Sequence, residues 1–81
     1  MKLKVRVYKG EDEEPDTTVT IPGGVLRLAS KLIPNRAKQA MLDEGIDMDE
    51  LVALAEQPDV QGTLVEVVEH EKHERVVVAL E

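Results

Sequence analysis

The residues with the clearest chemical potential are two histidines that lie three positions apart among glutamates, near the C-terminal end of the sequence. His70 and His73 have an H-x-x-H spacing, and imidazoles and carboxylates are groups that bind zinc or nickel. A turn rich in charged residues, however, is normally only solvated. We therefore interpret the pair as a surface turn and expect no metal and no cofactor. Metal or small-ligand binding by this turn is the alternative function.

The remaining reactive groups do not form a catalytic pattern. The sequence has no cysteine, and its one serine, Ser30, is far along the chain from either histidine. The acidic residues 11–16 lack the spacing of a calcium loop, and residues 22–24 lack the pattern of a phosphate-binding loop. Nucleophilic catalysis needs a nucleophile within reach of an oriented base. We therefore expect that the protein is not an enzyme.

Charge is distributed unevenly along the chain. The net charge of −7 argues against a nucleic-acid partner, because such binding depends on neutralising phosphates. Residues 17–42 contain no acid, and residues 43–56 contain no base. Two interpretations are open: neighbouring helices of opposite charge that attract each other, or a docking patch for an acidic partner. The basic residues of that patch are Arg27, Lys31, Arg36 and Lys38.

Length and composition define the class of protein. A chain of 81 residues builds one core, so we expect a single domain over residues 1–81. Tyr8 is the only aromatic residue, which leaves an aliphatic core without rings to line a planar-ligand pocket. No stretch approaches the roughly 18 apolar residues of a membrane span, and the first residues do not resemble a signal peptide. We expect a cytoplasmic protein with no membrane partner.

The N-terminal quarter of the sequence predicts a β-hairpin. Residues 2–8 alternate apolar and polar side chains, the pattern of a half-buried strand, and residues 18–21 alternate again. Residues 10–16 between them are charged, contain a proline and are expected to form a loop.

The middle of the chain predicts three consecutive helices. Residues 25–33 place apolar side chains at helical spacing over more than half of the circumference, and a second helix runs from about residue 35 to residue 44. Gly45 is placed to end that helix as its C′ residue. Asp47 as N-cap, with Glu50 three positions later, begins the third helix.

The last segment predicts a second hairpin, with strands at residues 64–68 and 76–80 and a turn at residues 70–73. The final strand is apolar on both faces, which is typical of a strand covered on both sides. The elements together indicate an α+β fold: two hairpins in a mostly antiparallel four-stranded sheet, with two or three helices on one face.

The stretch from residue 44 to residue 51, an acidic Gly-Ile turn that leads into a capped helix, resembles the turn and helix of short bacterial SHOCT-like domains. The order of the flanking elements is also similar to that of small bacterial domains of this kind. The resemblance implies a module that mediates association or regulates a larger protein, and it carries no catalytic residues.

These observations favour a non-catalytic protein-interaction or oligomerisation module. Val77 and Ala79 alternate with Val76, Val78 and Leu80, so one of these two sets is expected to face away from the helices. With Val65, Val67 or Val68 that set would form an exposed apolar strip, and Val77 and Ala79 are the candidates for it. A two-fold homodimer would cover such a strip. The alternative is that the connection at residues 57–62 or the N-terminal hairpin folds over it within one chain.

Overall fold

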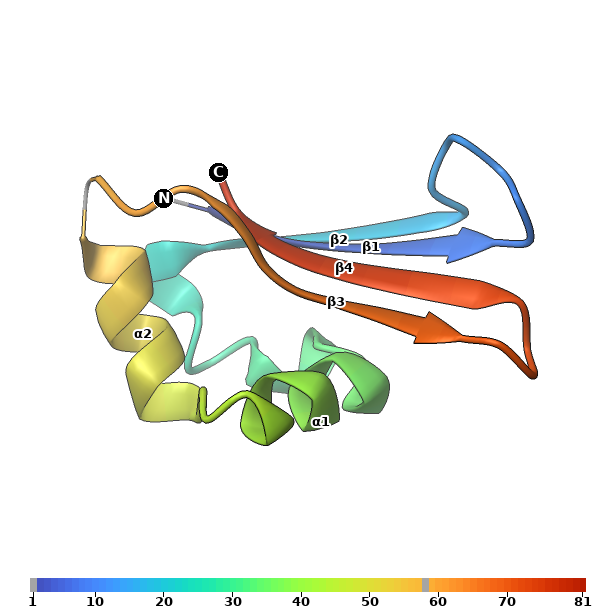
Figure 1. The fold of residues 1–81 in the computed structure, drawn as a ribbon. Helices are drawn as coiled ribbons and strands as arrows, with labels where there is room; N and C mark the ends of the chain where they lie inside the picture. Colours follow the sequence, from blue (N-terminus) through green and yellow to red (C-terminus); the bar gives the residue numbers. More distant parts are fainter. Residues whose placement is uncertain (1, 58) are drawn as a thin grey trace.

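An antiparallel sheet with helices on one face forms the protein (Figure 1). The structure is a computed structural model that describes residues 2–57 and 59–81. The four strands follow the order β2-β1-β4-β3, so the two hairpins meet at the central β1–β4 pair. This confirms the predicted α+β class and the four-stranded sheet. The elements are β1 (Lys2–Lys9), β2 (Thr17–Pro22), α1 (Asn35–Asp43), α2 (Met48–Glu56), β3 (Gly62–Glu69) and β4 (Glu74–Leu80).

The core lies between the sheet and the helices. The predicted alternation in β1 holds, because Leu3, Val5 and Val7 are buried while the residues between them are partly exposed. The register places buried residues of β4 directly opposite, so that aliphatic side chains from the two central strands cover the helix-facing side of the sheet. The facing pairs are Leu3 with Leu80, Val5 with Val78 and Val7 with Val76.

A register shift in the second hairpin explains its irregular apolar pattern. The pairing of β3 with β4 shifts between Thr63 and Val65, which is the position of a β-bulge. The extra residue, Leu64, interrupts the strict alternation of inward and outward side chains. Two neighbouring apolar residues of β3 can therefore both contact the core, where Val65 is buried and Leu64 is partly buried.

The prediction of a helix at residues 25–33 is wrong. This segment forms two short 3₁₀ turns, η1 (Gly23–Val25) and η2 (Ser30–Leu32), joined by further turn residues. Pro34 disfavours helical backbone in the residue before it, and Ile33 is extended with φ −76° and ψ 124°. Leu26 and Ile33 enter the core instead and fix the segment from either side.

The predicted end of α1 at Gly45 is confirmed. Gly45 has φ 81°, the left-handed conformation that glycine adopts without steric cost. The Gly45 N–H donates to the Leu42 carbonyl at 2.9 Å, and the Ile46 N–H donates to the Met41 carbonyl at 2.7 Å. These two bonds form a Schellman motif, which satisfies carbonyls at the helix end and turns the chain towards α2.

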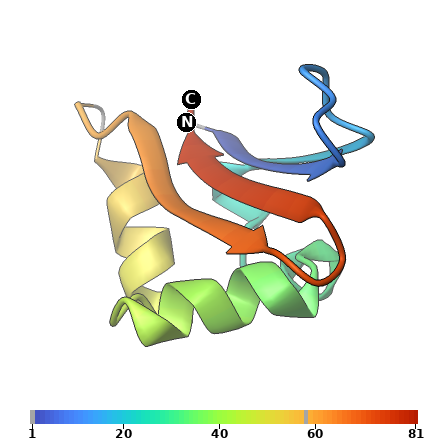
Figure 2. The same ribbon diagram turned by 45° about the vertical axis from the view of Figure 1, so that its right-hand side comes forward.

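The start of α2 is also confirmed. The Asp47 carboxylate accepts a hydrogen bond of 2.8 Å from the Glu50 N–H, as expected of an N-cap. α1 lies across the face of β3 and β4, whereas α2 stands at the end of the sheet and contacts η1 (Figure 2). The short connection between the helices therefore places the end of α1 and the start of α2 side by side. Within the described part of the chain, no helix has the length and apolar character needed to cross a bilayer.

Candidate functional site

The two histidines lie on the exposed turn that joins β3 to β4. His70 and His73 are both exposed, and His73 has a left-handed backbone with φ 51°. The Gly10 N–H donates to the His73 carbonyl at 2.6 Å, which ties this turn to the loop between β1 and β2. An open hollow of about 490 Å³ includes both histidines. Across residues 2–57 and 59–81, no three His, Cys, Asp or Glu side chains gather in a way that could hold a metal ion.

The basic segment is partly neutralised within the chain. Arg27 forms an ion pair with Asp49 of α2 at 2.6 Å, and Arg36 of α1 forms one with Glu74 of β4. The first pair joins the basic and acidic segments, as the intramolecular interpretation predicts. The described residues provide no ion-pair partner for Lys31 or Lys38. The positive charge available to an outside partner is therefore smaller than the sequence suggests.

The outer face of the sheet has a different character from the apolar strip expected there. Val77 lies on that face, between Arg6 of β1 and Glu66 of β3 in the strand register. Ala79 is only 5% exposed. Val68 is the one large apolar residue of this face that is strongly exposed among the described residues. The N-terminal hairpin does not fold over the face but extends the sheet beside β4.

The helix side of the molecule carries most of the exposed apolar residues. Apart from Val68, every strongly exposed large apolar residue in the described chain lies between residues 25 and 42. Leu28 is 81% exposed and Leu42 is 54% exposed. The helical spacing of residues 25–33 predicted that Leu28 and Leu32 would be buried, so sequence reasoning missed this surface. The signal that could have indicated these exposed leucines is a leucine-rich stretch with Gly-Gly before it and Pro after it.

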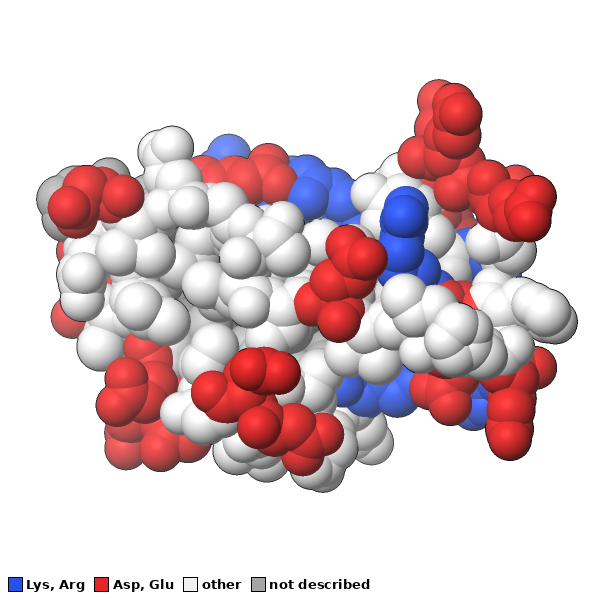
Figure 3. All heavy atoms as spheres, viewed as in Figure 1, with Lys and Arg blue, Asp and Glu red and all other residues white. Residues whose placement is uncertain are grey.

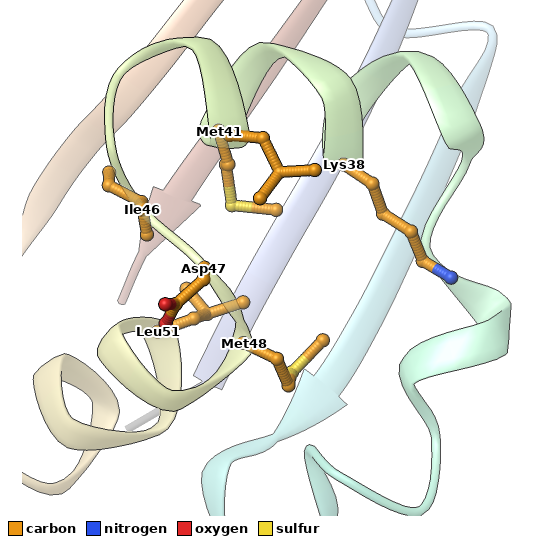
Figure 4. Close-up of a pocket in the computed structure, with 7 residues that line it drawn as sticks. Lys38, Met41, Ile46, Asp47, Met48 and Leu51 are labelled. Carbon is orange, nitrogen blue, oxygen red and sulfur yellow. The ribbon is translucent and has the colours of Figure 1, made fainter.

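An apolar pocket of about 180 Å³ opens beside Leu42, where α1 meets α2. Met41, Met48 and Leu51 line it, and Figure 4 shows their side chains converging from the two helices. Lys38 and Asp47 are the charged residues among those that line the pocket. In Figure 4 the Lys38 side chain points away from the pocket, towards the chain that precedes α1.

A second hollow lies further along α2 and extends the apolar area. Its volume is about 290 Å³, and residues 23–28 line it together with Val52 and Ala55. Met48 and Val52 are one helical turn apart, so they lie on the same face of α2 and connect the two hollows. We call this combined area the helix-side apolar surface; it consists of Leu28, Leu42, Met48 and Val52.

Charged side chains surround broad uncharged areas of the molecule. Figure 3 shows one face, on which acidic side chains predominate and form groups at the ends and along the lower margin. Asp43 and Glu44 line a hollow between α1 and β3, whereas Lys38 points to the opposite side of α1. Asp43 and Glu44 therefore lie on a different side of the end of α1 from Lys38.

The sheet with two helices on one face defines a small α+β domain. The model of the family described as YvlB-like protein, C-terminal domain matches residues 1–79, and the chain belongs to this family. This assignment supports the expected small bacterial domain but not the specific resemblance to SHOCT-like domains. No curated protein and no solved structure matches the chain significantly.

Proposed function

We propose that the protein is a non-catalytic interaction module that binds a protein through the helix-side apolar surface. The observation that carries this proposal is the exposure of Leu28 and Leu42, at 81% and 54%, beside hollows lined by further apolar side chains. Large contiguous apolar patches are uncommon on monomeric proteins and mark interaction sites when polar residues surround them. Aliphatic side chains and methionines provide contact area and adaptability, not reactivity.

The positions of the reactive groups support the non-catalytic part of the proposal. The described residues bring no nucleophile together with an oriented base: Ser30 is in η2, on the helix side, whereas both histidines are on the β3–β4 turn.

Affinity capture from a lysate of the source organism tests the proposal. The bait is the full chain, either wild type or with the double substitution Leu28→Asp and Leu42→Asp. The control is Val68→Asp, because Val68 is 51% exposed, close to the 54% of Leu42, but lies on the outer face of the sheet. Circular dichroism establishes that all three baits are folded.

We expect proteins captured by the wild type to be retained by Val68→Asp and lost with the double variant. Self-capture of the same chain counts as an interaction in this experiment. If the double variant captures the same proteins as the wild type, the helix-side apolar surface is not the binding site. The proposal is then wrong.

A further inference from the structure

We propose that the helix-side apolar surface binds the same surface of a second copy of the chain, which gives a dimer with two-fold symmetry. This inference rests on the proposed function and identifies its partner. A two-fold interface uses one patch on both subunits, so the patch must be complementary to itself in shape and in charge. The end of α1 satisfies both conditions.

The charge pattern beside Leu42 is self-complementary. Lys38 points to one side of α1, towards the basic segment that contains Lys31, and neither lysine has an ion-pair partner within the described chain. Asp43 and Glu44 lie on the opposite side of α1, next to β3. A two-fold axis that passes between Leu42 and the adjoining pocket exchanges these sides, so the lysines of each copy face the carboxylates of the other.

This pattern distinguishes between classes of partner. A uniformly acidic partner would be repelled by the carboxylates on one side, and a uniformly basic partner would be repelled by the lysines on the other. A surface with the two charges in reversed order is attracted on both sides. A second copy of this chain presents that surface as a result of symmetry alone.

The apolar contacts fit the same arrangement. Leu42 is 54% exposed and lies next to a pocket of about 180 Å³ lined by Met41, Met48 and Leu51. Because an apolar cavity of about 150 Å³ accommodates benzene, this pocket has room for an aliphatic side chain. In the proposed dimer, Leu42 of each copy enters the pocket of the other. The same contact then occurs twice, once from each copy, as a two-fold interface requires.

Light scattering on the full chain at high micromolar concentration measures the solution mass. We expect the wild type to have twice the single-chain mass of 9.0 kDa. Leu42→Asp places a charge in the apolar contact and should reduce the mass to one chain. Val77→Glu is the matched control on the outer face of the sheet and should leave the dimer intact. Thermal melts of each variant establish that it is folded.

A charge exchange tests the symmetry directly. The variant with Lys31→Glu and Lys38→Glu is acidic on both sides of α1, and the variant with Asp43→Lys and Glu44→Lys is basic on both sides. Each variant alone should lose the dimer by like-charge repulsion. An equimolar mixture should recover it as a heterodimer, and this recovery should weaken as salt is added.

Three results would overturn the inference. A single-chain mass for the wild type excludes the homodimer, but loss of captured proteins with the Leu28 and Leu42 double variant would still support the proposed function. A dimer that is lost on Val77→Glu and kept on Leu42→Asp moves the interface to the outer face of the sheet. A mixture of the two charge variants that stays monomeric excludes the proposed charge pairing.

Discussion

At the scale of single residues, Asp47 stabilises the start of α2. Its carboxylate accepts the Glu50 N–H, one of the amides that have no carbonyl partner within the helix. We expect Asp47→Ala to lower the free energy of unfolding by about 0.5–2 kcal/mol. In a domain of this size, such a loss lowers the melting temperature by several degrees. Urea titration and a thermal melt measure both quantities.

Asp47→Ser is the control for this substitution. Serine keeps a side-chain oxygen that can accept the same amide, so most of the stability should be retained. Equal melting curves for Asp47→Ala and the wild type would show that the hydrogen bond contributes nothing measurable.

The alternative function, metal binding by the turn that contains His70 and His73, can also be tested at the scale of single residues. A zinc site needs about four ligands, of which three or more come from the protein. The described residues gather no such group, so we expect the NMR signals of His70 and His73 to stay unchanged with one equivalent of zinc. Micromolar zinc affinity that disappears on His73→Ala would instead establish the turn as a metal site.

At the scale of elements, Gly45 ends α1 and turns the chain towards α2. Its φ of 81° is strained for any residue with a Cβ, although a Cβ there would meet no atom within 4 Å. We therefore expect Gly45→Ala to lower the free energy of unfolding by about 1–2 kcal/mol through backbone strain alone. Chemical denaturation provides the measurement.

Gly24→Ala is the matched control, because Gly24 has the same open surroundings and no positive φ. It should change the stability little. If the two substitutions have equal effects, the conformation of Gly45 is not what makes glycine necessary there.

The boundaries of α1 and α2 could be predicted from the sequence because their causes are local. Gly45 ends one helix and Asp47 begins the next through contacts within a few residues. The segment at residues 25–33 has no cap of this kind, and Pro34 directly restricts only the residue before it. Its conformation depends on Leu26 and Ile33 reaching a core that the sheet provides, and helical spacing alone does not contain that information.

At the scale of the whole molecule, burial separates leucines that look alike in the sequence. Leu80 of β4 is fully buried against Leu3, whereas Leu28 is 81% exposed. We expect Leu80→Ala to lower the free energy of unfolding by about 2–5 kcal/mol, a large share of the stability of so small a domain. Leu28→Ala should change it by no more than about 0.5 kcal/mol. Urea titration of both variants measures the two changes. A larger loss for Leu28→Ala than for Leu80→Ala would contradict this assignment of the core.

The position of the candidate site also depends on which apolar residues the assembled fold buries. Alternation in the last strand separated Val77 and Ala79 from Val76, Val78 and Leu80, but it did not show which set faces outward. Nor did the sequence show that Arg6 and Glu66 would lie on either side of Val77. Those neighbours come from strands far apart in the chain. The exposed leucines of residues 25–33 were missed for the same reason, because only the assembled fold determines which apolar residues remain without cover.

The pairing of the first and last described residues affects how the domain responds to mechanical force. Lys2 and Glu81 exchange two backbone hydrogen bonds, of 2.8 and 2.9 Å, so the chain enters and leaves the fold at the same end of the β1–β4 pair (Figure 1). Tension between these two residues acts across the strands and loads the hydrogen bonds of the pair one after another. The sheet then opens like a zipper, beginning at Lys2 and Glu81, and the two central strands of the core are the first to separate.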